Sequence, residues 1–394
     1  MVRTSRFLVK SVFVLVSAAA VASCQNASPT APSVTPAVVP DESDSGPATP
    51  APPTPPTPPT PPTPPPPTPP TPPTPPTPPT PPTPPTPPTP PAVSFVVRAL
   101  DALTGGGLAG VTVEGDGFTA AASDGSGQIR LTVNAEHSGD QQLVRFVGSS
   151  IVPRESLLRV PGADAEIDLI PASFDLDAFN QIARQPATKR WMTPPVVVVE
   201  QRVLQFDALD KTSWTPTATV KDAGYVQGLM SDLSAGLVEL TGGVIPSFER
   251  QDTRTSPGDA PIPITVSNQI TVFWVEGLAR HSGYDGYARW EYRNWVLTGG
   301  VILLDVDADR GSASRWLRFH ELGHTLGFTH VVSRPSLMAP SAQPMTEFDR
   351  HAGRLLYSRL PGNRAPDIDP DPTSLNRTAA PRWSSWMGTR LPRR

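Results

Sequence analysis

The chain has 394 residues, 54 of them proline and one of them cysteine, and its formal net charge is -4. A collagen-like repeat is excluded because 29 glycines cannot occupy every third position, and a disulfide scaffold is excluded because one cysteine cannot form an internal bridge. The charge balance lacks the basic character of a nucleic-acid-binding protein, so we expect no nucleic-acid partner. A hydrophobic content of 38% still allows ordinary folded cores outside the proline-rich part.

Residues 1–23 have the pattern of an export signal. Three basic residues precede an apolar run over residues 11–22, which is too short to span a bilayer. The run leads into the letters VASC, the last of which is Cys24, and small residues directly before a cysteine resemble the signal of bacterial lipoproteins. This resemblance implies that Cys24 carries acyl chains and anchors an exported protein to the cell envelope, at the outer membrane or facing the extracellular side. A cleaved signal peptide with an incidental cysteine is the alternative.

Residues 24–91 are predicted to form a stalk. From residue 54 to residue 91 the sequence is almost purely a Thr-Pro-Pro repeat. Such a segment has no core to bury, and proline restricts its own φ to the extended range. We therefore expect a stiff polyproline II rod with a rise of about 3.1 Å per residue. A ligand for proline-binding modules is the alternative.

Residues 92–171 contain short alternating runs separated by glycine-rich turns. The runs at residues 94–99, 110–114, 128–133 and 143–147 predict strands with one buried face, and hence a small β-sandwich. The turn chemistry of residues 101–113 and 123–127 resembles that of the carboxypeptidase regulatory-like sandwich. The resemblance implies a spacer or adhesive module without catalytic residues.

Residues 172–360 mix helix and strand patterns. The β-branched runs at residues 194–200 and 268–275 predict strands of one central sheet. Between them, apolar residues from Val226 to Leu240 recur at helical spacing, and Gly242 and Gly243 follow as a stop. The fold class we expect is a multidomain chain. After the disordered linker and the all-β sandwich comes an α+β domain with a twisted sheet and two principal helices. Residues 361–394 are expected to form an irregular tail.

The most informative segment is HELGHTLGFTH, at residues 320–330. On a helix His320 and His324 lie one turn apart on one face, so both imidazoles can bind the same zinc ion. Gly327 can end that helix with a positive φ and so bring His330 in as a third ligand. Three histidines leave the fourth position of a tetrahedral zinc open, as in catalytic sites. Glu321, offset by one residue, is expected beside the metal.

This segment resembles the HExxHxxGxxH motif of the metzincin zinc peptidases, and within them most closely that of the matrixins. The methionine turn of the family corresponds to Met338 in the letters SLMAP at residues 336–340. Residues 299–305 resemble the last sheet strand before the active-site helix, and residues 346–356 resemble the capped C-terminal helix that packs under the site. The resemblance covers about residues 194–359, and Val331 departs from the serine that matrixins usually have after the third histidine.

The resemblance implies a zinc metalloendopeptidase that acts on peptides or proteins. His320, His324 and His330 would bind Zn²⁺, and Glu321 would be the general base for a zinc-activated water molecule. Met338 would form a hydrophobic floor under the metal. Two other functions stay open: a surface-binding or adhesion lipoprotein with an inactive zinc domain, and a zinc amidase that acts on cell-wall peptides.

Two further expectations concern calcium and latency. Asp305, Asp307 and Asp309 could bind Ca²⁺ through carboxylate oxygens, although Arg310 follows where a calcium loop has glycine; an exposed acidic loop is the alternative. A cysteine switch is excluded because Cys24 is the only thiol. Aspartates at positions 175 and 177 could block the zinc instead, although we favour a helix between the domains for this segment.

Overall fold

The computed structural model describes residues 92–134, 139, 141–160, 165–310, 314–375 and 379–392. These residues belong to one unit of the chain, Thr83–Arg394. The predicted export signal, Cys24 and the Thr-Pro-Pro stalk lie outside them. A search of the described helices finds none that combines the length and the apolar character needed to cross a membrane.

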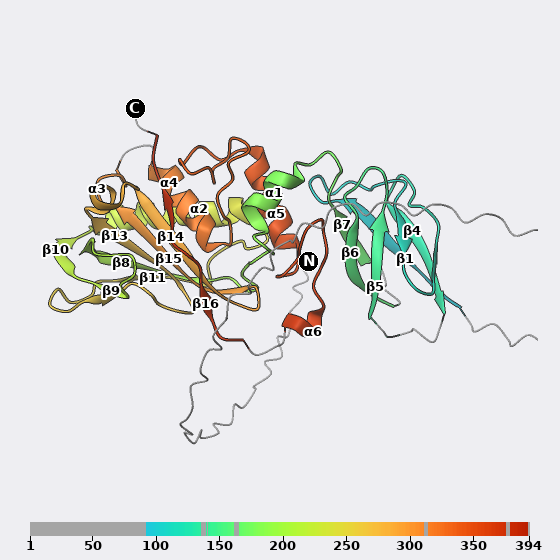
Figure 1. Cartoon of the computed structure of the whole chain (residues 1–394), viewed down its shortest axis with the longest axis horizontal. Coiled ribbons are helices and arrows are strands. Elements are labelled where there is room, and N and C mark those ends of the chain that lie inside the picture. Colours follow the sequence, from blue (N-terminus) through green and yellow to red (C-terminus); the bar gives the residue numbers. More distant parts are fainter. Residues whose placement is uncertain are drawn as a thin grey trace, which may run out of the picture. The chain divides into compact units, whose positions relative to one another are not determined.

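The first described region consists of two small sheets that enclose one core (Figure 1). The core forms because alternate residues of the strands point inward, among them Val97, Leu131 and Phe146, all fully buried. The four strands predicted from sequence are confirmed, whereas β3, β6 and β7 were not predicted, since β3 is short and charged or polar residues interrupt β6 and β7. One sheet has the order β3 (Phe118–Ala120), β4 (Gln128–Asn134), β1 (Ala92–Asp101), β7 (Ala165–Leu169), and the other β2 (Thr112–Glu114), β5 (Gln141–Val147), β6 (Arg154–Arg159).

The second region is built on an eight-stranded sheet with the order β10-β8-β13-β15-β14-β16, in which β11 also pairs with β8 and β17 also pairs with β14. Strands β11, β8, β13 and β15 are parallel, and β14 runs antiparallel to β15. The predicted central strands are confirmed as β8, β13 and β15. The bounds are β8 (Val196–Gln205), β10 (Pro216–Val220), β11 (Arg250–Arg254), β13 (Ile270–Glu276), β14 (Gly286–Arg293), β15 (Val296–Asp305), β16 (Arg382–Trp383) and β17 (Met387–Thr389).

Both faces of this sheet are covered, which explains the nearly continuous apolar sequence of its central strands. On β13, Val272 and Trp274 point into the core shared with the helices, whereas Phe273 and Val275 point into a second core on the opposite face. The helices on the first face are α1 (Leu176–Ala183), α2 (Ala223–Leu240), α4 (Ser314–Thr325) and α5 (Glu347–Ser358) (Figure 1). The second core includes residues of the small sheet of β9 (Ser213–Trp214) and β12 (Ile262–Pro263) and of the short helix α3 (Leu278–Ser282).

The predicted helix ends are also found. Helix α2 is followed by Gly242 and Gly243, both with positive φ. At the start of α5 the Thr346 side chain accepts a hydrogen bond from the Asp349 amide, and the Asp349 side chain accepts one from the Thr346 amide, which is the predicted capping box. The segment around residue 177 forms α1, the helix favoured for it from sequence.

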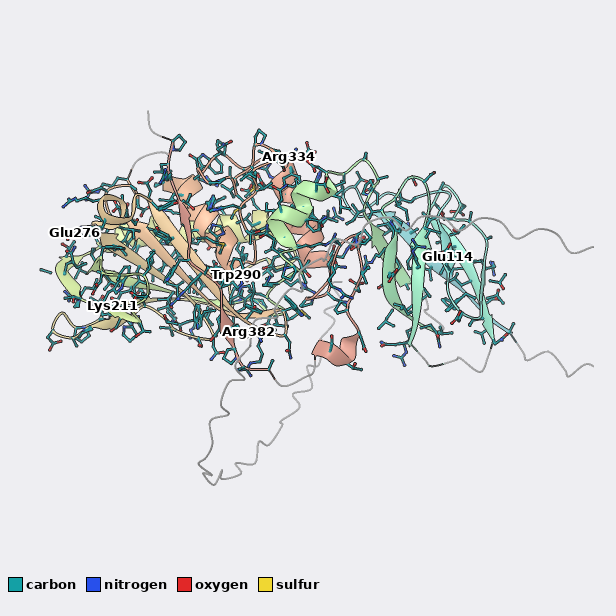
Figure 2. All side chains as sticks on the ribbon, in the orientation of Figure 1. Glu114, Lys211, Glu276, Trp290, Arg334 and Arg382 are labelled. Atoms are coloured by element: carbon teal, nitrogen blue, oxygen red, sulfur yellow. The ribbon has the colours of Figure 1, made fainter. Side chains whose placement is uncertain are left out.

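The expectation of an irregular tail over residues 361–394 needs correction. Strands β16 and β17 extend the large sheet along the outer edge of β14, and α6 (Pro372–Leu375) lies before them. Figure 2 shows Trp290 on β14 and Arg382 on β16 at this edge. Strands of two and three residues are too short to show an alternating pattern, so sequence periodicity could not reveal them.

The same tail also contributes to a buried ion-pair cluster. The carboxylate of Asp367 is paired with Arg184 at 2.7 Å and with Arg359 at 2.8 Å, and all three side chains are fully buried. Nearby, Asp369 accepts hydrogen bonds from Arg154 and Ser156 of β6 at 2.9 and 2.8 Å. We call these residues, together with Asn363, the ion-pair cluster. It joins the first region to the second through contacts that are far apart in sequence.

Candidate metal centre

Helix α4 carries the first two residues of the histidine triad. It packs against α2 on one side and against β14 and β15 on the other, which leaves little room for solvent. His320 and His324 are both fully buried, and His330, in the loop after the helix, is partly buried. Burial of three imidazoles without a carboxylate partner is costly unless another group binds them.

The three imidazoles converge through their Nε2 atoms. The distance from His320 Nε2 to His324 Nε2 is 3.0 Å, and both atoms lie 3.2 Å from His330 Nε2. A search of the described residues for three or more histidine, cysteine or acidic side chains close enough to hold a metal ion finds this group. The structure thus brings together the three residues that the spacing predicts.

The other ring nitrogens determine the tautomer of two of the histidines. His320 Nδ1 lies 2.6 Å from the Leu337 carbonyl oxygen, and His324 Nδ1 lies 2.9 Å from the Phe328 carbonyl oxygen. A carbonyl oxygen can only accept a hydrogen bond, so each Nδ1 carries the proton. The Nε2 atoms of both rings therefore present lone pairs toward each other and toward His330, an arrangement that a cation would stabilise.

The residues fit a zinc ion. Two nitrogens that share a tetrahedral zinc at 2.0–2.1 Å lie about 3.3 Å apart, which is close to the separations found here. Burial lowers the pKa of His320 to about 3 and holds the pKa of His324 well below its ordinary value. Both imidazoles are therefore neutral at pH 7, as metal ligation requires.

The turn at Gly327 brings His330 to the other two histidines. Gly327 has a φ of 102°, and a Cβ atom there would collide with the carbonyl oxygen of Lys189, so glycine is required at this position for two reasons. The Thr329 amide donates a hydrogen bond to the Ile182 carbonyl oxygen at 2.8 Å, and the Thr329 hydroxyl donates to the Gln181 carbonyl oxygen. Helix α1 therefore holds the loop that carries the third histidine.

The methionine turn lies directly under the triad. Met338 is fully buried, and a Cβ atom on Gly323 would lie 2.6 Å from its sulfur atom, so the thioether packs against α4 at Gly323. Asp349 at the start of α5 accepts a hydrogen bond from the Leu337 amide at 2.9 Å and another from the Ser336 hydroxyl. The sequence predicted only a cap at the start of this helix. An aspartate at position 349, where a capping box usually has glutamate, was the one local signal of a second role.

Glu321 follows His320 on α4, and its carboxyl group is buried against Gly286 and near the Thr389 hydroxyl. Neither oxygen of its carboxyl group has a hydrogen-bond partner within the described part of the chain. Burial raises the pKa of Glu321 well above its ordinary value, and the hydroxyl of Thr389 has the opposite and smaller effect. A Cβ atom on Gly286 would lie 2.5 Å from Glu321 Oε1, so β14 can lie this close to Glu321 only because residue 286 is glycine. Sequence analysis missed Gly286 and Thr389, whose contacts with Glu321 are non-local.

The acidic residues considered for calcium do not converge. Asp305 accepts hydrogen bonds from the amides of Asp307 and Ala279, at 2.9 and 2.8 Å. Asp309 is fully buried and pairs with Arg318 at 2.7 Å, whereas Asp307 is exposed. The buried carboxylates of this loop thus have partners other than a cation.

The aspartates considered for latency lie at the start of α1. Asp175 caps this helix by accepting a hydrogen bond from the Ala178 amide, and it pairs with Arg334 at 3.0 Å. The Asp175 carboxylate therefore binds the start of helix α1 and Arg334, and not the triad.

Comparisons with protein-family models and with curated protein sequences identify no relative of the chain. No protein-family model matches the chain, and no curated protein sequence matches it significantly.

Proposed function

We propose that the protein is a zinc-dependent endopeptidase of the metzincin type. The observation that carries this proposal is the meeting of three Nε2 atoms within 3.2 Å of one another beside a buried carboxyl group that lacks a partner. A structural zinc site would use a fourth protein ligand, and the triad offers three. The motif and the methionine turn at Met338 support the family.

The residues have distinct roles in this proposal. His320, His324 and His330 hold Zn²⁺, which when bound lowers the pKa of a water molecule and polarises a carbonyl group. Glu321 accepts a proton from the attacking water molecule at a carboxylate oxygen and returns it to the departing amine. Its lack of a protein donor leaves both oxygens available for this transfer. The carbonyl oxygens of Leu337 and Phe328 orient His320 and His324.

Zinc analysis combined with a peptidase assay tests the proposal. The purified full chain should contain one zinc ion per molecule and should cleave an unstructured protein such as casein. Glu321→Gln should retain the zinc and lose activity by a factor of about 10²–10⁴. Retained turnover in this variant would refute the assignment of the general base.

A panel of substrates separates the alternatives. Zinc binding without cleavage of any protein or peptide would favour an adhesion lipoprotein with an inactive zinc domain, and cleavage of cell-wall peptides alone would favour an amidase. His324→Ala is the matched control because it should lose both the metal and the activity.

We also propose that the protein is exported and anchored to the cell envelope through acylated Cys24. The support is the basic and apolar pattern of residues 1–23 followed by VASC. When the gene is expressed in a bacterium that acylates lipoproteins, the chain should be recovered with the membrane fraction. Cys24→Ala should release it or leave its signal uncleaved.

A further inference from the structure

The outer edge of β14 is the sheet edge nearest to the metal centre. Helix α4 packs on β14, and Gly286, the first residue of that strand, lies against Glu321. An unpaired strand edge is a template for any extended chain, because its amide and carbonyl groups can pair with the backbone of another segment. What occupies this edge therefore decides what else can approach the triad.

The occupant is residues 382–391, which we call the tail segment. Its strand β17 pairs antiparallel with β14, with Thr389 opposite Gly286 and Met387 opposite Ala288. Before it, β16 pairs with the other end of β14. The edge that could receive a peptide beside the metal centre is thus already paired with a strand of the same chain.

A second backbone holds the tail segment on its other side. The Arg390 amide donates to the Pro340 carbonyl oxygen at 3.2 Å, and the Ala342 amide donates to the Arg390 carbonyl oxygen at 2.8 Å. This loop follows Met338 directly, and Ser341 forms a parallel bridge with Arg390. The tail segment therefore lies in a groove with β14 as one wall and the loop after the methionine turn as the other.

The register places the tail segment over the general base. Side chains alternate along a strand, so Met387 and Thr389 both point toward the face that α4 covers. Thr389 is fully buried, and it pairs with Gly286, the residue that lies against the Glu321 carboxyl group. The glycine opposite Thr389 leaves the space that Glu321 fills. Thr389 thus closes the side of the site on which Glu321 lies.

We propose that the tail segment is a built-in occupant of the groove that receives extended peptides, and that it keeps the metal centre closed until it is displaced. The identity of the displacing peptide as a substrate rests on the proposed peptidase function, whereas the closure rests on the contacts above. The ligand class is an unfolded peptide in extended conformation, because a groove with pairing backbone groups on both sides selects a strand and not a helix.

The attachments of the tail segment allow such displacement. Its anchor is Trp386, whose Nε1 donates to the Leu209 carbonyl oxygen at 2.8 Å and whose ring lies 4.2 Å from the Arg289 guanidinium carbon. The Leu391 amide adds a hydrogen bond to Asp285 at 2.7 Å. Trp386, Met387 and Leu391 are half-buried and pack against the margins of the two cores, whereas Ser385 and Arg390 are exposed. Displacement would leave the helices and the central strands in place.

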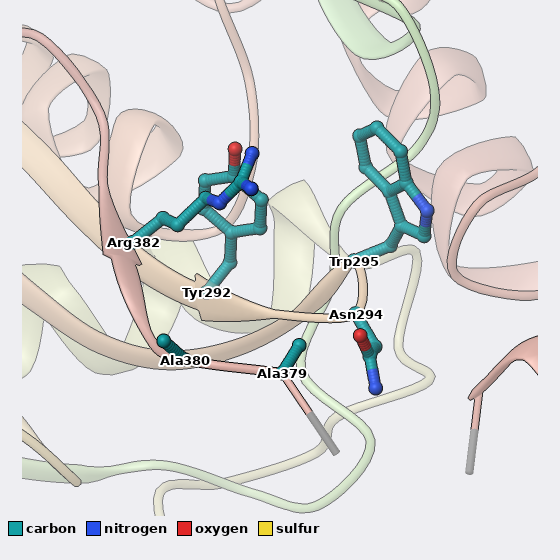
Figure 3. Close-up of a pocket in the computed structure, with 6 residues that line it drawn as sticks. All are labelled: Tyr292, Asn294, Trp295, Ala379, Ala380 and Arg382. Carbon is teal, nitrogen blue, oxygen red and sulfur yellow. The ribbon is translucent and has the colours of Figure 1, made fainter. Parts of the chain in front are cut away.

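The end of the tail segment that is farther from the triad is also loosely packed. A pocket of about 360 Å³ lies between the tail and the turn that joins β14 to β15 (Figure 3). Its lining includes Tyr292 and Trp295 from the turn region and Ala380 and Arg382 from the tail side. Ala380 and Arg382 are exposed. Peeling the tail from this end would therefore uncover little apolar core.

The test uses a substitution that pushes β17 away without touching the triad. A Cβ atom on Gly388 would lie 2.7 Å from a ring carbon of Tyr287 and 2.8 Å from one of Tyr284, so Gly388→Val should weaken the pairing with β14. Ser385→Val is the matched control, because it adds a similar side chain to an exposed position of the same segment.

Two measurements on the zinc-loaded full chain keep closure and catalysis apart. A coloured chelator should remove zinc from Gly388→Val at least tenfold faster than from the wild type, and kcat/KM for an unstructured peptide should rise at least tenfold. Ser385→Val should match the wild type in both. Equal chelation rates in all three proteins would overturn the closure. Faster chelation without activity in any of them would retain the closure and refute the peptidase.

If Gly388→Val does not fold, the wild-type protein supplies the decisive measurement. A peptide hydroxamate that binds zinc must enter the same groove, so hydrogen exchange of the amides at positions 386–391 should accelerate when it is bound, while exchange in β15 stays unchanged. Unchanged protection of residues 386–391 in the inhibitor complex would overturn the proposal.

Discussion

The metal centre and the ion-pair cluster around Asp367 are both buried in the same unit of the chain, but only the ion-pair cluster contains groups of opposite charge that pair with one another. In the ion-pair cluster every charged side chain faces one of opposite sign, as in the pairs of Asp367 with Arg184 and Arg359. In the metal centre, Glu321 has no partner among the described residues and three imidazole nitrogens face one another. Buried charges that are paired within the protein indicate a structural role, whereas converging titratable groups without an ion-pair partner indicate a site that acts on another molecule or ion.

The largest effect on stability should come from the ion-pair cluster. Asp367→Ala leaves two fully buried guanidinium groups without their shared carboxylate, which should lower the free energy of unfolding by about 3–5 kcal/mol. Urea denaturation measures this loss. The exposed substitution Asp307→Ala is the control and should change stability by less than about 0.5 kcal/mol. If Asp367→Ala changed the stability as little as Asp307→Ala, the ion-pair cluster would have no structural role.

The opposite sign is expected at Glu321. Replacing a buried carboxyl group that lacks a partner by an apolar side chain of similar size, as in Glu321→Leu, should raise the stability of the metal-free protein by about 1–3 kcal/mol. The same variant should have no peptidase activity. Urea denaturation in the presence of a chelator provides the measurement, and a loss of stability would show that Glu321 has a structural partner after all.

A weaker effect is expected for the residue that supports the methionine turn. The Asp349 carboxylate accepts a hydrogen bond from the Leu337 amide, and the Leu337 carbonyl oxygen accepts one from His320 Nδ1. Asp349→Asn should therefore lower zinc affinity by about 10–100-fold, because the orientation of the first histidine depends on this chain of hydrogen bonds. Competition with a chelator of known affinity measures the change. Wild-type affinity in this variant would contradict the proposed support.

The smallest effect belongs to the helix cap. Thr346→Ala removes the side-chain acceptor for the Asp349 amide and a hydroxyl that donates to Asp349 Oδ2, and it should cost about 1 kcal/mol of stability. Since the contact of Asp349 with Leu337 remains, zinc affinity should stay at the wild-type value. This substitution therefore separates the cap from the support of the turn, and a joint loss of both properties would show that they cannot be separated.

The parts of the site that sequence could predict are those encoded locally. His320, His324, Gly327 and His330 lie within eleven positions, so helical spacing and one glycine are enough to place them. The strands β8, β13 and β15 were predictable because both of their faces are buried and their apolar runs are long. Helix α2 was predictable because its buried apolar residues recur at helical spacing.

The parts that sequence could not predict depend on distant contacts. Thr389 and Gly286 meet Glu321 from strands far away in the chain, and β17 has three residues without a recognisable pattern. The calcium expectation relied on the spacing of Asp305, Asp307 and Asp309. Asp309 instead pairs with Arg318, which comes from the next helix. Ion pairs between distant segments leave no periodic signal in a single sequence.

The hydrogen bonds between Thr329 and helix α1 have a consequence for the order of folding. Thr329 and Gln181 are separated by 148 residues, yet their contact helps to hold the loop of the third histidine. Closing so large a loop has an entropic cost and is slow compared with the formation of a helix. We therefore expect the two helical histidines to come together early and His330 to join them after α1 has docked. On this expectation, a motif of eleven residues becomes a complete zinc ligand set at a late stage of folding.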